Sequence, residues 1–259
     1  MPLMPTRAYS RFKSQSEALL HFSVLVAYAV PALRADISNV KSALKTSLPT
    51  PDFFHKSSRS TPDDLLRTEA TYEHSLAAYL LLAHFSFFES FVLDIIMEMI
   101  DFHGGAKEFV NRNERRAKQF VAPHRADIAK LKRKLQDSEK ASWRDRYRSY
   151  ARKLAGEGFR FPGELFAPYG LRTFMLKVKR MKAHEIPSIL VDALRVDLSE
   201  SEIKRYDDIR EIRNSIAHGQ PTSLTMREVV EMNKFLRGLA VKISEHFSEN
   251  LFVIEKYAP

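Results

Sequence analysis

The sequence predicts an all-α fold, arranged as a helical bundle. Hydrophobic residues make up 44% of the 259 positions and include 18 Phe, which is ample for a core. Glycine occurs only 8 times, and residues with high helix propensity are common. Apolar residues also recur at steps of three and four along several long segments, which is the period of an amphipathic helix. This composition excludes disorder as the main state of the chain.

The N-terminal region predicts two helices, one from about Ser14 to Ala29 and one from Leu33 to Lys45, with Pro31 between them. The apolar stretch 18–33 follows several basic residues and in this respect is similar to a secretion signal. Glu17 interrupts that pattern, as do His21 and Pro31, so we expect a core helix instead.

The next helix has a clear beginning. Thr61 is a suitable N-cap, Pro62 fits the first helical position, and two aspartates follow at the positive end of the helix dipole. The helical pattern continues to about Phe102, with one break expected near Thr68, and Gly104-Gly105 ends it. Its expected buried stripe consists of Leu76, Tyr79, Leu80, Ala83, Phe87, Phe91, Ile95 and Met99.

The segment 76–100 is long enough to span a bilayer, for which about 20 residues suffice. It carries His84, Glu89, Asp94 and Glu98, and several ionisable groups in one span are costly. We therefore expect a buried helix of a protein that does not enter a membrane. His84 is expected to be a core histidine with its hydrogen bonds satisfied.

A basic block occupies the middle of the chain. Between Asn111 and Lys182 there are 21 Lys and Arg against 7 Asp and Glu, and with the whole chain at +9 the remainder carries −5. This asymmetry predicts a polyanionic partner, although a solvated helical surface has the same composition. The block, taken as residues 107–182, is expected to be a basic helical insertion within a single domain covering residues 1–259.

Two capping boxes predict the last two helices: Ser199 with Glu202, and Thr225 with Glu228. The first helix should end near Ala217, before Gly219 and Pro221. The second should bury one face, formed by Val229, Met232, Leu236, Leu239, Ile243 and Phe247.

Between these helices lies the most informative motif, Arg213-Asn-Ser-Ile-Ala-His218-Gly219. Arginine is always charged and its planar fork matches phosphate oxygens, while histidine normally titrates near pH 6.5 and can transfer a proton. Such a pair supports cleavage of a phosphodiester in RNA, which carries its own 2′-hydroxyl nucleophile. A histidine that caps the helix end and an arginine whose stem lies in the core would give the same pattern. On an ideal helix the two side chains point roughly 140° apart, so they need the helix end or a second chain to converge.

The motif resembles the signature of the HEPN superfamily, which comprises small all-α ribonucleases and RNA-binding modules. Phe87-Phe88-Glu89-Ser90-Phe91 is also similar to an early helix of several HEPN branches. The resemblance implies a metal-independent endoribonuclease that acts as a homodimer and needs no cofactor. In it, Arg213 would stabilise the scissile phosphate, His218 would be the acid and base, and Asn214 would support them. Glu89 either enters this site or pairs with an arginine.

The resemblance further implies products with 2′,3′-cyclic phosphate and 5′-hydroxyl ends, and a role in toxin–antitoxin systems or antiviral defence, with an antitoxin or defence-system partner. Members paired with nucleotidyltransferase antitoxins often carry a tyrosine two residues after the histidine, where this chain has Gln220. RNA is the expected partner, and its binding is assigned to Lys177, Lys179, Arg180 and Lys182.

Other function classes fit the sequence less well. The histidines are scattered, which argues against a metal site, and no glycine-rich loop suits a nucleotide. With no cysteine, the chain has neither a disulfide framework nor a thiolate zinc site, and it fits the reducing cytoplasm. Two alternatives stay open: a non-catalytic RNA-binding or interaction module that uses the motif as a helix cap, and a protein whose basic block binds anionic lipid.

Overall fold

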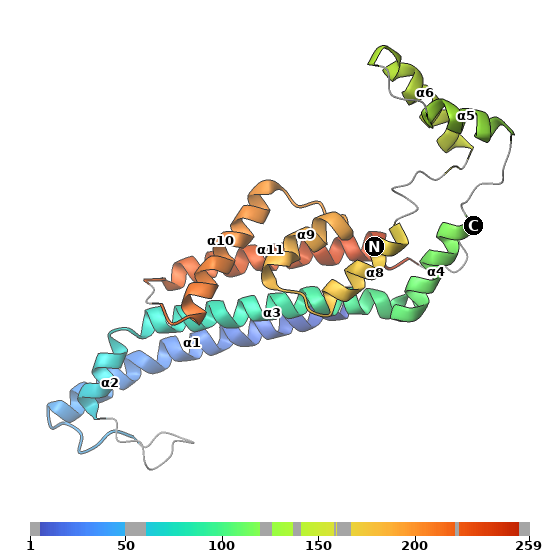
Figure 1. Cartoon of the computed structure of the whole chain (residues 1–259). Coiled ribbons are helices and arrows are strands. Elements are labelled where there is room, and N and C mark those ends of the chain that lie inside the picture. Colours follow the sequence, from blue (N-terminus) through green and yellow to red (C-terminus); the bar gives the residue numbers. More distant parts are fainter. Residues whose placement is uncertain are drawn as a thin grey trace. The chain divides into compact units, whose positions relative to one another are not determined.

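A computed structural model describes residues 6–49, 61–119, 126–136, 141–157, 159, 167–220 and 223–253, and every element within these ranges is helical. The all-α prediction is confirmed (Figure 1). The elements are α1 (Arg7–Lys41), α2 (Pro62–Glu69), α3 (Tyr72–Phe102), α4 (Ala106–Gln119), α5 (Ala126–Gln136), η1 (Ala141–Trp143), α6 (Arg144–Gly156), α8 (Ala167–Val178), η2 (Ala183–Glu185), α9 (Ile186–Ser188), η3 (Ile189–Ala193), α10 (Glu200–Ala217) and α11 (Met226–Asn250).

The chain forms two compact units. The first contains Met1–Met99 and Lys182–Val253, and the second contains Ile100–Met181 with Ile254–Pro259. The second unit therefore covers almost the same residues as the expected insertion 107–182, and the segments on either side of it form the first unit. Whether the chain is one domain with an insertion stays a prediction.

Helix α3 supplies the centre of the first unit's core. Phe85, Phe88 and Phe91 are all buried on it. Helix α1 runs antiparallel beside it: Arg11 near the start of α1 pairs with Asp94 at 3.2 Å, and the Phe12 ring lies 6.2 Å from that of Phe88 and 5.4 Å from that of Phe91.

Helix α10 packs onto the same aromatic cluster through Tyr206. The Tyr206 ring stacks on that of Phe85 at 5.5 Å and lies 5.9 Å from that of Phe88. Its hydroxyl donates a hydrogen bond to the carbonyl of Ala183 at 2.9 Å. Because the hydroxyl has a partner, this large ring is buried at little polar cost.

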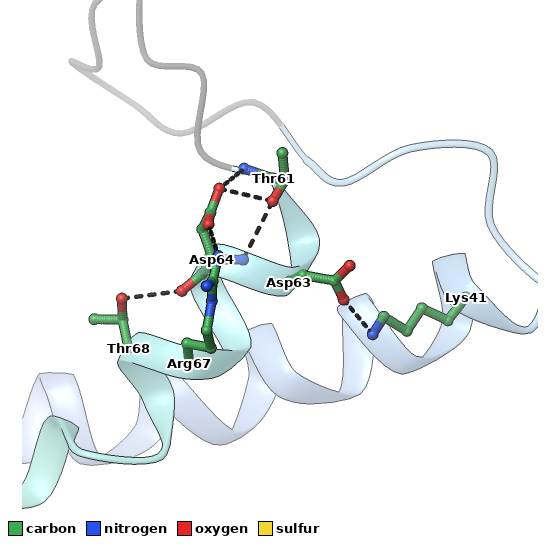
Figure 2. Close-up of polar contacts among 6 residues, drawn as sticks. All are labelled: Lys41, Thr61, Asp63, Asp64, Arg67 and Thr68. Atoms are coloured by element: carbon green, nitrogen blue, oxygen red, sulfur yellow. Dashed lines mark hydrogen bonds and ion pairs between the residues drawn. The ribbon is translucent and has the colours of Figure 1, made fainter.

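The helix beginnings confirm the signals in the sequence. Thr61 caps α2 by accepting a hydrogen bond from the amide of Asp64, whose side chain bonds back to Thr61 (Figure 2). At the same helix end, Asp63 pairs with Lys41 of α1 at 2.6 Å. The predicted break in the long helical segment lies between α2 and α3, two residues beyond the expected Thr68.

Helix α11 packs against α1 in the first unit. Both predicted capping boxes, at Ser199 and Thr225, are present. The apolar stripe predicted for α11 is buried as expected. At the far end of the helix, the Ser244 and Thr6 hydroxyls are 3.1 Å apart, which joins α11 to the start of α1.

The prediction that Pro31 separates two helices is wrong, because α1 is continuous through it. Proline lacks an N–H and leaves the carbonyl four residues earlier without its helical partner. Pro31 and Ala27 are both exposed, so water can bind that carbonyl at little cost. The chain turns only after Lys41, where Ala43 has a φ of 57°.

The expectation of a core helix at 18–33 is also wrong. Several large apolar side chains of this segment are exposed: Leu20, Phe22, Val24, Leu25 and Tyr28. By length and composition α1 and α3 could each cross a membrane; 6% of the most apolar window of α1 and 50% of that of α3 are buried. The predicted buried stripe of α3 is wrong at Tyr79. The Tyr79 side chain is 68% exposed, while the neighbouring Leu80 and Leu81 are buried.

Within the described residues, the α-helices of the second unit form two pairs. Helix α4 packs against α8, and Arg172 of α8 donates a hydrogen bond to Glu114 of α4 at 2.7 Å. Helix α5 packs against α6, and Ile128 and Leu154 are buried on them. Proline disfavours the helix interior, so the sequence also predicts that Pro123 separates two basic helices, but Pro123 lies outside the described residues.

His84 lies in the core of the first unit, but it is not satisfied as predicted. It is only 2% exposed, and its Nε2 atom has no hydrogen-bond partner. Burial lowers the pKa of His84 from its usual 6.5 to about 4, and the nearby Arg237 charge adds to the effect.

We expect His84 to make folding pH-dependent. Its folded pKa lies below its unfolded value, so the native state binds fewer protons between pH 6.5 and about 4. The contribution of neutral His84 to the free energy of unfolding is complete above pH 6.5 and is lost as the pH falls to about 4. The whole contribution is about 3 kcal/mol. Urea unfolding from pH 7.5 to 4.5 should show His84→Leu losing stability less steeply than wild type. The exposed His184→Leu should keep the wild-type slope, and equal slopes for all three proteins would contradict the assignment.

Candidate functional site

The Arg213–Gly219 motif forms the last turn of α10 and its stop. His218 is the C-cap residue, and Gly219 adopts a φ of +73°, which favours glycine. The Gly219 amide donates to the carbonyl of Ile216, and the Gln220 amide donates to that of Ser215. These two bonds are those of a Schellman motif, so the helix ends here by local geometry.

Arg213 turns inward from α10 and is held on three sides. Its Nη2 donates to Glu89 on α3 at 2.7 Å, and its Nη1 donates to the Asn214 side-chain oxygen at 3.0 Å. The guanidinium also lies over the Phe85 ring, 5.2 Å from its centroid, which adds a cation–π contact. Asn214 therefore orients Arg213, one of the two motif residues that it was expected to support.

The Glu89–Arg213 pair is partly buried, with side chains that are 26% and 24% exposed. Burial raises the pKa of the Glu89 carboxyl, and the Arg213 charge and hydrogen bond act against that shift. Glu89 pairs with an arginine as expected, and that arginine is Arg213 of the motif. The carboxylate also raises the pKa of the adjacent buried Tyr206, although burial of that hydroxyl is the larger cause.

His218 lies apart from this ion pair. It is exposed at the end of α10, and no hydrogen bond joins it to Arg213 among the described contacts. The ending of the helix at Gly219 therefore does not by itself bring the two side chains together, which agrees with their angular separation on an ideal helix.

The four cations assigned to RNA binding are all exposed, and no ion pair of theirs is found among the described residues. Lys177 lies at the end of α8, and Lys179 and Arg180 follow it in the second unit. Lys182 belongs to the first unit and precedes η2. Among the described residues, no group of three or more His, Asp or Glu side chains could hold a metal ion.

Sequence reasoning did not assign Phe85 or Tyr206 to this site. The signal for Tyr206 was present, because it lies seven residues before Arg213 on the same apolar arc of the helix. Phe85 had no such signal, since apolar residues occur on several faces of α3 around it and periodicity does not select one face.

Comparison with known proteins adds a family to this geometry. Residues 52–249 match the family model described as RiboL-PSP-HEPN, which covers the motif and the helices that hold it. The chain belongs to the RiboL-PSP-HEPN family. No curated protein and no solved structure matches the chain. Membership of the HEPN superfamily indicates a ribonuclease or another RNA-related function, and the match also extends across the basic block.

We expect the Glu89–Arg213 pair to be a measurable stabilising interaction. Glu89→Gln and Arg213→Met should each lower the free energy of unfolding by roughly 1–3 kcal/mol, because each leaves a partly buried partner without its charge-assisted bond. In a double-mutant cycle the two changes should couple by at least about 1 kcal/mol.

Denaturant unfolding of the two single variants and the double variant measures this coupling. The exposed Glu231–Lys234 pair of α11, also 2.7 Å apart, provides the control and should show no measurable coupling. Additive effects at Glu89 and Arg213 would mean that the ion pair contributes nothing to stability.

Proposed function

We propose that this protein is a metal-independent endoribonuclease of HEPN type that acts as a homodimer. One observation carries the proposal: a complete Arg213–Asn214–His218 motif, with an ordered guanidinium and an exposed histidine, at the end of a helix in a member of this family. The proposed substrate is RNA, and no cofactor is required.

In the proposed reaction, the 2′-oxygen of a ribose attacks the adjacent phosphorus, and the bond from phosphorus to the 5′-oxygen breaks. One proton leaves the 2′-hydroxyl and one reaches the departing 5′-oxygen, which gives a 2′,3′-cyclic phosphate and a 5′-hydroxyl. His218 is proposed to carry out this proton transfer, because a histidine can take or give a proton near neutral pH. Arg213 is proposed to offset the negative charge that develops on the phosphate oxygens.

The contacts of Arg213 are compatible with phosphate binding. A guanidinium has five N–H donors, and the bonds to Glu89 and Asn214 use two of them. The Nε–H is buried without a partner, so a phosphate would meet the remaining Nη hydrogens. Glu89 and Asn214 would then act as positioning residues that hold the fork in one orientation.

The homodimer is proposed because Arg213 and His218 of one chain point in different directions. Two copies of α10 facing each other would place the His218 of one chain near the Arg213 of the other. The site would then be composite, and a variant that stays monomeric should cleave far less than the dimer.

One observation favours a second candidate, a non-catalytic RNA-binding or interaction module. Arg213 already has a carboxylate partner in its own chain, and His218 is the C-cap residue of α10. An arginine and a histidine with purely structural roles would show these same contacts.

Either candidate fits a cytoplasmic protein of a toxin–antitoxin or antiviral system with its own antitoxin or defence-system partner. Gln220 argues against regulation through a modified tyrosine at that position.

We expect His218→Ala to abolish RNA cleavage while leaving RNA binding intact, because the change removes the proton carrier and little else. Labelled single-stranded RNA is incubated in excess chelator with wild type, His218→Ala and His184→Ala, the last being an exposed histidine outside the motif. Wild type and His184→Ala should produce fragments with 2′,3′-cyclic phosphate ends.

Each other result has a definite meaning. Tight RNA binding by all three proteins without cleavage would support the non-catalytic module. Equal cleavage by wild type and His218→Ala would remove the motif from the reaction. A monomeric variant that cleaves as well as the dimer would exclude the composite site.

We expect reversal to Glu of Lys177, Lys179, Arg180 and Lys182 to weaken RNA binding. A plot of log affinity against log salt concentration has a negative slope. For every phosphate that the variant no longer neutralises, this slope should become less steep by roughly 0.7 for single-stranded RNA. Titrations of labelled RNA at several salt concentrations measure both effects.

A variant with the same total charge change, made at exposed cations outside the block, separates local contacts from net charge. Suitable positions are Lys13, Arg67, Lys204 and Arg227. If the two variants lose affinity equally, or if neither does, the four predicted residues are not an RNA-binding site.

A further inference from the structure

Helices α5 and α6 pack against each other and form a pair that is strongly basic on its outside (Figure 1). Together they contain nine Lys and Arg against two Asp. All of these cations except Lys132 are exposed. The pair belongs to the second unit, whereas the motif at the end of α10 belongs to the first. None of the nine is among the four cations to which RNA binding was assigned, so this surface still lacks a function.

The inside of the pair is apolar. Ile128 of α5 and Leu154 of α6 are buried. Half-buried aromatic residues recur at steps of three and four up to Leu154: Trp143, Tyr147 and Tyr150. The apolar side chains of the pair are thus engaged in its own packing, and within the described residues of α5 and α6 no large hydrophobic side chain is exposed.

The outside of α6 carries a ridge of arginines. Arg144, Arg148 and Arg152 follow one another at steps of four residues, and all three are exposed. On an α-helix such steps keep the side chains within about 80° of each other and set them about 6 Å apart along the axis. Like charges at this spacing repel each other and destabilise the helix. Asp145 pairs with Arg148 at 3.5 Å, but both side chains are largely exposed, so the pair offsets little of the repulsion.

The outer side of α5 adds further positive charge. Its exposed cations lie away from the buried Ile128: Lys130, Arg133 and Lys134. No ion pair of these three is found within the described part of the chain. Because each helix turns its apolar side to the other, the basic sides of α5 and α6 face away from the pair in different directions. A partner with several negative charges would relieve the repulsion on either side.

Two observations favour RNA over an anionic membrane as this partner. Helices that bind to a membrane surface insert apolar side chains into it, and α5 and α6 expose none of large size within their described residues. The chain also belongs to a family with RNA-related functions, and the family match covers both helices. The choice of arginine for the ridge fits such a partner, because its planar fork matches the oxygens of a backbone phosphate.

We propose that α5 and α6 form an RNA-binding surface in which Arg144, Arg148 and Arg152 bind phosphates of an RNA strand. The contacts are to the backbone, so the binding does not depend on base sequence. This proposal deepens the proposed function and rests on it, since it names a part of the chain that binds the proposed substrate. It adds a second surface to the cations at 177–182.

Titration of the full-length protein with labelled single-stranded RNA tests the proposal. Every protein in the titration carries His218→Ala, so that the proposed cleavage does not alter the RNA. Replacing Arg144, Arg148 and Arg152 by Gln should weaken RNA binding at least about tenfold. The slope of log affinity against log salt should become less steep by roughly 2, because three phosphate contacts are lost at roughly 0.7 each. Lys at the same positions keeps the three charges, so that variant should keep the slope of the unsubstituted ridge.

A matched control separates the ridge from net charge. Gln at Arg67, Arg205 and Arg227 removes the same charge from exposed arginines of the first unit and should have a much smaller effect on affinity. The ridge variant should fold, because its arginines are exposed, Gln has a similar helix propensity, and the change removes repulsion within α6. Thermal unfolding without RNA checks this for all the variants.

Three results would overturn the proposal: undiminished RNA binding by the Gln ridge variant, an equal loss in the first-unit control, or a loss of slope in the Lys variant. Vesicles of equal parts phosphatidylserine and phosphatidylcholine should not bind. If they bind through the three arginines while RNA binding is unchanged, lipid is the partner and the proposal is wrong.

These results are separate from those on the proposed ribonuclease. A protein that binds RNA through the ridge but never cleaves it would exclude the ribonuclease and leave the RNA-binding surface. A protein that cleaves RNA but binds it equally well without the three arginines would exclude this surface and leave the ribonuclease.

Discussion

The organisation of the motif depends on one interaction, the ion pair between Glu89 of α3 and Arg213 of α10. The two residues are 124 positions apart in the chain, and the bond joins the central helix to the helix that carries the motif. A partly buried guanidinium and a partly buried carboxylate each need the other, because either one alone is costly away from bulk water. Phe85 and Tyr206 pack beside the pair and limit the positions that the guanidinium can adopt. As a result, the end of α10 has a fixed place against α3, with Arg213 facing the core and His218 facing solvent.

The aromatic cluster explains why α3 can hold helices on several sides. Phe12 of α1 contacts Phe88 and Phe91, while Tyr206 of α10 contacts Phe85 and Phe88. Phe88 therefore touches both neighbouring helices. A helix that is packed on more than one side must be apolar around most of its circumference, and this is the composition that makes α3 similar to a membrane span. The same property made its buried face hard to predict, because an apolar helix has no strong periodicity.

Features that depend on local chemistry could be predicted from the sequence, and features that depend on distant partners could not. The caps at Thr61, Ser199 and Thr225 and the stop at Gly219 involve residues a few positions apart, so their patterns are visible in the chain. The α11 stripe was also correct, because α11 is clearly amphipathic. The expectations for Pro31 and for the segment 18–33 failed because they depend on which side of α1 the rest of the fold covers. His84 failed for the same reason: its burial followed from its apolar neighbours, but the lack of a partner for Nε2 depends on α1 and α11.

For the candidate site, the sequence supplied the chemical groups, and the fold supplied their orientation. Arg213 faces inward and His218 faces outward because they lie on opposite sides of a helix whose apolar arc contains only the arginine. This arrangement separates two requirements of the proposed reaction, a rigid cation and an accessible proton carrier. Glu89 and Asn214 hold the cation, while the Schellman turn exposes the histidine. Because the two groups of one chain point apart, the proposed ribonuclease mechanism is combined with a proposed homodimer, in which a second chain supplies the missing partner.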